Sequence, residues 1–277
     1  MAALLSAGAS VHVEDNNSET SLHKAGRRGV AEAIETLLAA GAIVHVQNHS
    51  GQTALHKAGG GVLADAVAAL LAAGAYVHMR TNNGETALHC AGERGSAAVV
   101  AALLAGGAHV DAQTNGVDTT LLLAGTRGRI GTVAALLAGG ADVHVRDRTG
   151  ETALHKASRS GLNGMVVVLL AAGADTNPNG WTPLHVAVDA EVRRTDRVAE
   201  CVTVGGSVRV KLDGWRGVVL ALLLAGADVT GLERRGAELC ARLSASVPLL
   251  GPRQALRLRR AERCGPRVGA GIAGAHE

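Results

Sequence analysis

A four-residue phrase that opens with threonine returns every 33 residues along most of this chain. The sequence of this phrase is Thr-Ala-Leu-His in three copies, and the other copies differ from it at one or two residues. Self-similarity at such a period is typical of stacked repeats, in which each unit contacts only its neighbours. The 277 residues are therefore expected to form a linear array, whose length reflects repeat number. The phrase begins at Thr20, Thr53, Thr86, Thr119, Thr152 and, after a shorter interval, Thr182.

Two further features keep the same phase as the threonine phrase. A Leu-Leu pair recurs at residues 37–38, 70–71, 103–104, 136–137 and 169–170, and a Gly-Ala pair follows each at residues 41–42, 74–75, 107–108, 140–141 and 173–174. Together the three features resemble the ankyrin repeat family over roughly residues 1–229. The resemblance implies an all-α solenoid of helix-turn-helix units, each with a β-hairpin finger, and a non-catalytic scaffold or adaptor that binds another protein.

Residues 51–83 illustrate how one repeat is expected to fold. Thr53 is suited to cap a helix because its hydroxyl can accept from N–H groups of the first turn. This predicts a first helix over residues 54–60. The apolar spacing from Asp65 to Ala73 predicts a second helix, and Gly74 is expected to end it in the left-handed conformation. One such unit cannot bury its own faces, so stability comes from stacking.

The composition limits the kind of core and the compartment. Aromatic residues make up 1% of the chain and Phe is absent, so the interior must be built from Leu, Ala and Val. No charge-free run of about 18 apolar residues and no signal-peptide pattern is present. The cysteines, which lack Cys-x-x-Cys spacing, are expected to be reduced thiols. We therefore expect a soluble intracellular protein, with the cytoplasm as the favoured compartment. The cysteines are Cys90, Cys201, Cys240 and Cys264.

Glycine stands in the first helix of four repeats where the family usually has alanine. These residues are Gly26, Gly59, Gly92 and Gly125. Each interior glycine costs a helix about 1 kcal/mol relative to alanine. Because residues 59–61 are three consecutive glycines, the second full repeat is predicted to open locally before the others.

The repeat phase also predicts the boundaries along the chain. Residues 1–15 match the second half of a repeat and suggest a truncated N-terminal end, and residues 16–190 hold the repeats. Residues 191–213 delay the second helix of the last repeat, which is expected within 214–229. This insert is expected to be either a floppy loop or a binding element. Residues 230–264 are expected to form capping helices, and residues 265–277 a disordered tail.

The basic character of the protein belongs to its C-terminal segment. Residues 230–277 have a net charge of +5, whereas the remainder has −2. A basic cluster can dock an array onto nucleic acid or an anionic membrane, but aromatic residues that stack on single strands are missing. Docking through the tail is therefore the alternative function, and a merely solvated tail is the other interpretation. The cluster comprises Arg257, Arg259, Arg260 and Arg263.

The sequence carries no pattern of catalysis, metal binding or cofactor binding. Glycines 59–61 lack the Lys-Ser/Thr of a phosphate loop. The histidines of the threonine phrase are those that the family uses for hydrogen bonds between turns. A second row, one per repeat, is spaced too widely to share one metal ion. We expect no enzyme and no cofactor, unless the chain is the recognition part of a longer enzyme or channel. The second row comprises His12, His45, His78 and His144.

Partner binding is the remaining function, and the resemblance places it in a concave groove formed by fingers and first helices. Just before each threonine lies a mostly acidic row: Glu19, Gln52, Glu85, Asp118 and Glu151. The first helices carry a second, mostly basic set: Arg27, Arg28, Glu93, Arg94, Arg127 and Arg159. These stripes are expected either to select a partner of mixed charge or to act only as a solubilising surface. The array itself is expected to be a monomer.

Overall fold

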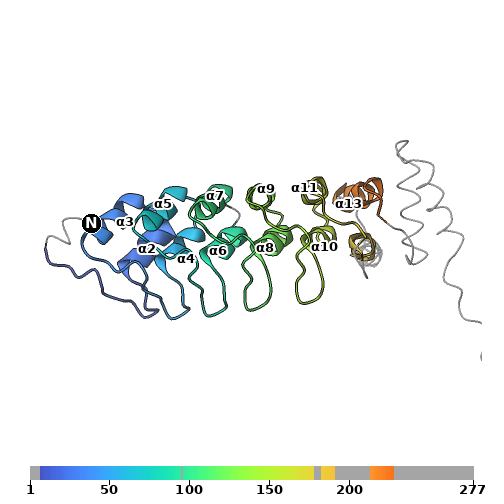
Figure 1. Cartoon of the computed structure of the whole chain (residues 1–277). Helices are drawn as coiled ribbons and strands as arrows, with labels where there is room; N and C mark the ends of the chain where they lie inside the picture. The colour runs from blue at the N-terminus through green and yellow to red at the C-terminus, as the bar shows by residue number, and fades with distance from the viewer. Residues whose placement is uncertain (1–6, 95, 178–181, 191–212, 228–277) are drawn as a thin grey trace, which may run out of the picture. The chain divides into compact units, whose positions relative to one another are not determined.

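The computed structural model describes residues 7–94, 96–177, 182–190 and 213–227. The chain divides into two compact units, Met1–Ala153 and Leu154–Glu277, whose described helices are labelled in Figure 1. Of the predicted segments, the C-terminal helices, the tail, the arginine cluster and all but the last residue of the insert expected over 191–213 lie outside the described residues.

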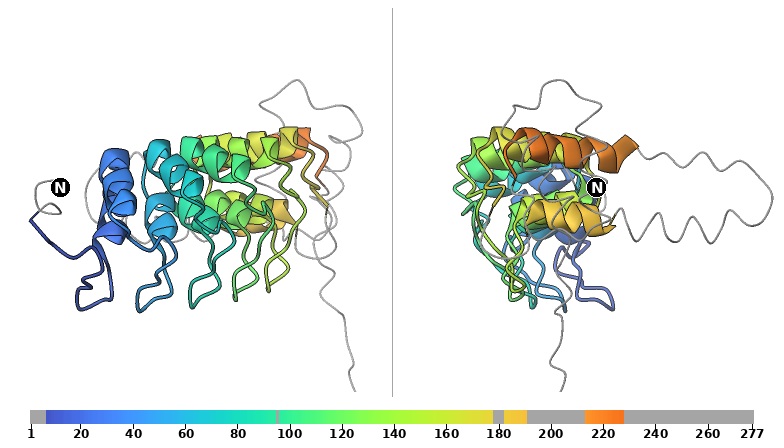
Figure 2. Two further views of the ribbon diagram at one scale, coloured as in Figure 1. Left: turned by 60° about the vertical axis from the view of Figure 1, so that its left-hand side comes forward. Right: turned by 90° about the vertical axis from the view of Figure 1, so that its right-hand side faces the viewer.

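The described residues of the first unit form four helix pairs arranged in two layers. The first helices of the repeats pack against one another in chain order, α2 on α4, α4 on α6 and α6 on α8. The second helices do the same, α3 on α5, α5 on α7 and α7 on α9. Figure 2 shows the two layers, with the connecting loops projecting beside the first helices. The helices are α2 (Ser21–Arg28), α3 (Ala31–Ala39), α4 (Ala54–Gly59), α5 (Ala64–Ala72), α6 (Ala87–Arg94), α7 (Ala97–Ala105), α8 (Thr120–Arg127) and α9 (Ile130–Ala138).

The second unit repeats the pattern with a longer interval before its last helix. It contains α11 (Asn163–Ala171) and α13 (Asp213–Leu224), which pack together. The helix α10 (Ala153–Arg159) begins at the last residue of the first unit, and residues 183–190 are also helical. The second helix of the last repeat, expected within 214–229, corresponds to α13, which begins one residue earlier.

Threonine and glycine mark the helix ends as their chemistry predicts. Thr53 is the N-cap of α4, in extended conformation, and it forms a capping box with His56. At the other end of the unit, Gly74 has φ of +81°, a value that glycine adopts without steric cost. The amide of Ala75 donates to the carbonyl of Leu70 at 2.9 Å, which closes the last turn of α5 in the manner of a Schellman motif.

The core consists of leucine, alanine and valine from both layers, as the composition predicts. Leu55 and Leu88 of the first helices are 1% and 0% exposed, and Leu70 and Leu103 of the second helices are fully buried. Such short side chains let the helices pack in thin layers.

The first-helix glycines permit close approach between neighbouring repeats. A Cβ atom on Gly59 would lie 2.4 Å from the carbonyl oxygen of Ala87 in the next first helix. At Gly125 the nearest atom would be the Cβ of Ala153, at 3.3 Å. Glycine at position 59 is therefore required by packing, in addition to weakening its helix.

The fingers are loops that tight turns close, and the described residues contain no β-strand. Among those residues, the one strand-like feature is an isolated antiparallel bridge between Gln113 and Thr119. The hairpin expected from the family resemblance is therefore not formed as a ladder here, and backbone and side-chain turn bonds hold the fingers.

Candidate protein-interaction face

Each finger closes on one polar residue that organises the turn, and this residue recurs every 33 positions. In the second finger Asn48 Oδ1 accepts from the amides of Ser50, at 3.0 Å, and Gln52, at 2.9 Å. All five equivalents accept from the amide four residues later. These turns fix the backbone of the mostly acidic row that precedes the threonines. The turn residues are Asp15, Asn48, Thr81, Thr114 and Asp147.

Neighbouring fingers in the first unit are tied together at their tips. Asn82 Nδ2 donates to the carbonyl of His49 at 3.0 Å, and Asn115 Nδ2 donates to the carbonyl of Asn82 at 3.0 Å. The guanidinium of Arg148 contacts the carbonyl of Asn115. Because each bond spans 33 residues, it couples a finger to the next one along the array.

Three buried histidines form a second link between repeats. The amide of Thr53 donates to Nδ1 of His56 at 3.1 Å, and Nε2 of His56 lies 3.2 Å from the carbonyl oxygen of Glu85. A carbonyl oxygen can only accept, so Nε2 carries the proton and the imidazole is neutral. His23 and His89 make the same bonds, to the carbonyls of Gln52 and Asp118. Burial lowers the pKa of all three imidazoles, because desolvation disfavours the charged form. The hydrogen bonds between turns implied by the family resemblance are therefore formed in these repeats.

The fourth repeat lacks this histidine link. Leu122 occupies the histidine position and is 1% exposed, so no imidazole bridges to the next finger. Thr119 still caps α8, since its hydroxyl accepts from the amide of Leu122 at 3.4 Å.

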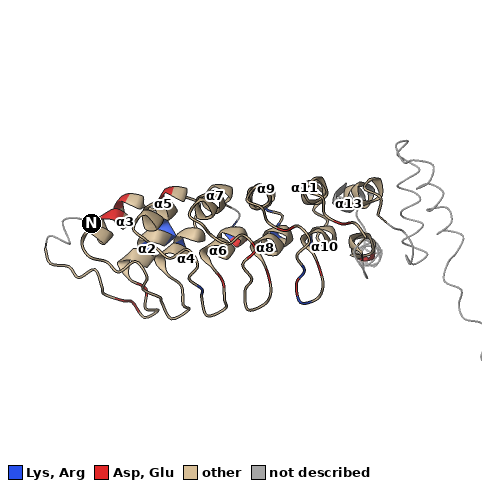
Figure 3. Ribbon diagram, in the orientation of Figure 1, with Lys and Arg blue, Asp and Glu red and all other residues tan. Residues whose placement is uncertain are grey.

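Charged side chains gather on the surface formed by the first helices and the finger turns, which we call the loop–helix face. Figure 3 shows charged residues along the first helices and fingers and none on α7 or α9. Of the predicted partner-binding residues, the five arginines are exposed and one acid is buried. The others are half-buried: Gln52, Glu85, Glu93, Asp118 and Glu151.

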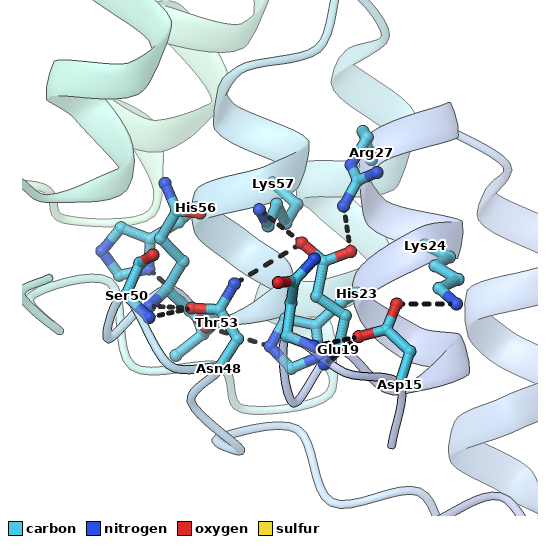
Figure 4. A network of polar contacts seen from close by, with 12 residues as sticks. Asp15, Glu19, His23, Lys24, Arg27, Asn48, Ser50, Thr53, His56 and Lys57 are labelled. Carbon is cyan, nitrogen blue, oxygen red and sulfur yellow. Dashed lines mark hydrogen bonds and ion pairs between the residues drawn. The ribbon is translucent and has the colours of Figure 1, made fainter. Parts of the chain in front are cut away.

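The buried acid is Glu19, which is 6% exposed and lies in a network of polar contacts (Figure 4). Its carboxylate pairs with Lys57 Nζ at 2.7 Å and contacts the guanidinium of Arg27. Asn48 Nδ2 lies 3.5 Å from the carboxylate. Although desolvation raises the pKa of Glu19, the bonds to Lys57 and Arg27 outweigh it, so the pKa is lowered. Glu19 thus joins two repeats instead of presenting a free charge.

Another ion pair in this part of the face involves the first finger itself. Lys24 Nζ lies 2.9 Å from Asp15. The bond from Lys24, together with backbone N–H bonds, lowers the pKa of Asp15 to about 2. The two N-terminal repeats therefore neutralise much of their own charge.

The face differs around the third repeat, where acids lie close together. Burial raises the pKa of Glu85, and the neighbouring charge of Glu93 raises it further. Glu93 has an exposed partner, Arg127, at 3.4 Å. Burial, with added repulsion from both glutamates, raises the pKa of Cys90 to about 12. At neutral pH Cys90 is therefore a protonated thiol and a poor nucleophile.

Sequence reasoning missed a set of ring contacts on the finger loops. The rings of His45 and Tyr76 stack with centroids 3.8 Å apart, and those of His78 and His109 stack at 4.2 Å. The pairs are 31 residues apart, two short of the repeat, so the periodic alignment does not place them side by side. The spacing of 31 is the signal that would have revealed them.

The described residues hold neither a metal-ion site nor a membrane-spanning helix. Within residues 7–94, 96–177, 182–190 and 213–227, no group of three or more His, Cys, Asp or Glu side chains is placed to hold a metal ion. In the same ranges, no helix combines the length and apolar character that a membrane span needs.

Comparison with known families agrees with the architecture. The family model described as ankyrin repeats matches the chain in three overlapping copies, over residues 1–81, 59–147 and 121–199. The chain therefore belongs to the ankyrin repeat family, whose members are generally protein–protein interaction modules and typically non-catalytic. A search of the curated proteins found no match to this sequence.

Proposed function

We propose that this chain is a non-catalytic scaffold or adaptor that binds another protein through the loop–helix face of its repeats. The observation that carries the proposal is the contrast between the two layers of the first unit. The loop–helix face presents charged side chains of both signs. The second helices of this unit carry only acids, in α3 and α5, and α7 and α9 carry no charge and expose small residues such as Ala98 and Ala101. Charge patterns guide partner choice and encounter, so the side with varied charges is the side that can select a partner.

Rigid presentation is the mechanism. The finger turns, the links between finger tips and the buried histidines all hold backbone next to the loop–helix face in place. A surface ordered before binding loses little conformational freedom when a partner docks. The expected contact residues are the exposed arginines Arg27, Arg28, Arg94, Arg127 and Arg159 with the half-buried Gln52, Glu85, Glu93, Asp118 and Glu151. Glu19 supports this surface from beneath.

The proposal is tested by site-specific crosslinking. A photoreactive residue is placed at Arg94 or Arg127 of the full chain, and at the exposed positions Ala68 and Ala101 of the second helices as matched controls. A partner should be captured from positions 94 and 127 and not from 68 and 101. Capture from the second-helix positions alone would refute the proposed face.

Charge reversal supplies an independent measurement. For the captured partner, Arg94→Glu combined with Arg127→Glu should weaken binding by about tenfold at low salt, with a smaller loss near 0.5 M salt because screening weakens exposed charges. Docking through the basic tail would instead be supported if the affinity does not change on charge reversal and binding is lost when residues 251–267 are deleted.

A further inference from the structure

The repeat register allows two carboxylates in equivalent places to be compared. Glu85 occupies the position of Glu19 two repeats later, immediately before the helix-capping threonine. Both follow a finger turn that fixes their amide, which donates to Asp15 Oδ1 at 3.0 Å in the first case and to Thr81 Oγ1 at 3.1 Å in the second. The two side chains therefore leave the backbone from matching local structures.

The surroundings of Glu19 show what this position can hold. Lys57 Nζ reaches the carboxylate from the next first helix at 2.7 Å, with only 16% of its side chain exposed. Arg27 approaches from the helix that follows Glu19, and Asn48 approaches from the next finger. The position thus accommodates a cationic side chain that is largely withdrawn from water.

At Glu85 the equivalent neighbours have changed. Leu123 stands in the place of Lys57, Glu93 in the place of Arg27, and Thr114 in the place of Asn48. Both cations are therefore replaced, one by an apolar residue and the other by a like charge. In the part of the chain that the structure describes, the carboxylate of Glu85 has no hydrogen bond or ion pair from a side chain.

The electrostatics agree with a missing cation. Desolvation raises the pKa of Glu85 and the charge of Glu93 adds to the effect, so the ionised form is held in an unfavourable setting that a nearby positive charge would relieve. Arg127 contacts Glu93. It supplies the neighbouring acid with a partner and does not reach Glu85 in this structure.

The remaining neighbours suit the stem of a long cationic side chain. Leu123 and Cys90 are both half-buried and take up the register position that lysine occupies at residues 24, 57 and 156. The Cys90 thiol is neutral. Lysine and arginine bury their methylene stems against apolar surface while the charged head reaches a polar group. The leucine and the thiol can therefore contact the stem of such a side chain, and the carboxylate can pair with its charged head.

We propose that Glu85 receives a lysine or arginine side chain from the partner protein, in the place that Lys57 fills beside Glu19. The stem of that side chain lies along Leu123 and Cys90, and its head pairs with the carboxylate. The inference rests on the proposed function and names the chemistry that the loop–helix face recognises at its third repeat: a basic segment of a partner polypeptide.

The test uses the full chain and a defined probe, hexalysine with blocked ends. Binding is followed by the carboxyl carbon resonance of Glu85 and by titration of the probe, beside a control peptide of six Nε-acetyl-lysines that keeps the stems without the charge. Wild-type protein should bind hexalysine saturably and the acetylated peptide much more weakly. Glu85→Gln, which removes the charge at nearly constant volume, should weaken binding about fivefold, as expected for one ion pair.

Three further variants separate the site from general charge effects. Leu123→Lys should fill the place internally and weaken hexalysine binding about fivefold, whereas Leu123→Met should retain it. Glu35→Gln removes an exposed acid of α3 and should leave the affinity within about twofold of wild type. Circular dichroism checks that each variant is folded, and Glu85→Gln decides the question if Leu123→Lys does not fold.

Equal affinity of wild type and Glu85→Gln would overturn the inference, as would equal binding of hexalysine and its acetylated form. The crosslinking result is independent of this outcome. Partner capture from position 94 without hexalysine binding would reject the cation site and leave the proposed interaction face standing. Hexalysine binding at Glu85 without any partner capture at positions 94 and 127 would support the site and reject the wider face.

Discussion

Mild acidification should destabilise the repeat array through its buried histidines. His23, His56 and His89 are at most 2% exposed, and each uses Nδ1 as an acceptor from the preceding threonine. Protonation would put a second N–H against that donor and place a charge in the interior. Burial lowers the pKa of each below its ordinary value of 6.5. The unfolded chain therefore binds protons more readily, so the histidine contribution is complete above pH 6.5 and declines as the pH falls below it.

The size of the effect follows from the number of protons. Each histidine that stays neutral in the fold while the unfolded chain is protonated costs about 1.4 kcal/mol per pH unit. Because the unfolded imidazole is only half protonated at pH 6.5, these three groups together contribute at most about 3 kcal/mol between pH 6.5 and pH 5.5. The carboxylate of Glu19, whose pKa is lowered, remains ionised throughout this window. Glu85, whose pKa is raised by burial and by the charge of Glu93, contributes to the pH dependence with the opposite sign.

Urea denaturation at pH 7.5, 6.5 and 5.5 measures this dependence, and His56→Leu provides the decisive variant. Leucine already occupies the equivalent buried position at Leu122, so the substitution matches a side chain that the fold accepts. His56→Leu should remove the share of one histidine from the pH dependence of the unfolding free energy, about 1 kcal/mol between pH 6.5 and pH 5.5, and His144→Leu, at an exposed position, is the control. An unchanged pH dependence in His56→Leu would refute the assignment of the effect to the buried row.

Three further predictions concern stability in urea at pH 7.5. Val117 has φ of +67°, which strains a β-branched residue, so Val117→Gly should raise the unfolding free energy by about 1 kcal/mol, and a loss would contradict the strain argument. Gly59→Ala should lower the unfolding free energy because its new Cβ meets a carbonyl oxygen, whereas Gly125→Ala should leave it unchanged or raise it by up to about 1 kcal/mol. Equal effects of the two substitutions would show that helix propensity alone governs both sites. Glu19→Gln should lower the unfolding free energy by about 2 kcal/mol because it leaves a half-buried lysine unpaired, while Glu85→Gln should be neutral or stabilising. Equal losses would contradict the inference that the two carboxylates have different surroundings.

The architecture was predictable because its signals are local and repeated. Thr53 and Gly74 bound a helix pair by hydrogen bonding and backbone conformation, and neither depends on distant residues. The observed α4 and α5 lie within a residue of the predicted spans. Repetition then multiplies a modest local signal into a fold assignment, which the family comparison confirms.

The role of individual charges was harder to predict, because it depends on the neighbouring repeat. Sequence reasoning placed Glu19 and Glu85 in one acidic row, and their backbones do match. What separates them is the residue 38 positions later, Lys57 in one case and Leu123 in the other. Likewise the sequence marks Gly59 only as a weak point of its helix. The contact that requires a glycine there lies on the next first helix and is not visible in the local sequence.

Internal differences between repeats are therefore the most informative signal about recognition in this protein. A carboxylate such as Glu19, already paired within the fold, gains little from a partner, because binding would only exchange one cation for another. A carboxylate such as Glu85 lies beside a like charge and, in the described residues, has no side-chain cation paired with it; the resulting cost in the free protein is relieved when a positive group pairs with it. The scaffold is the same at both positions, so the difference in binding capacity comes from side chains alone. A basic residue of the partner is thus expected to bind at the third repeat and not at the first.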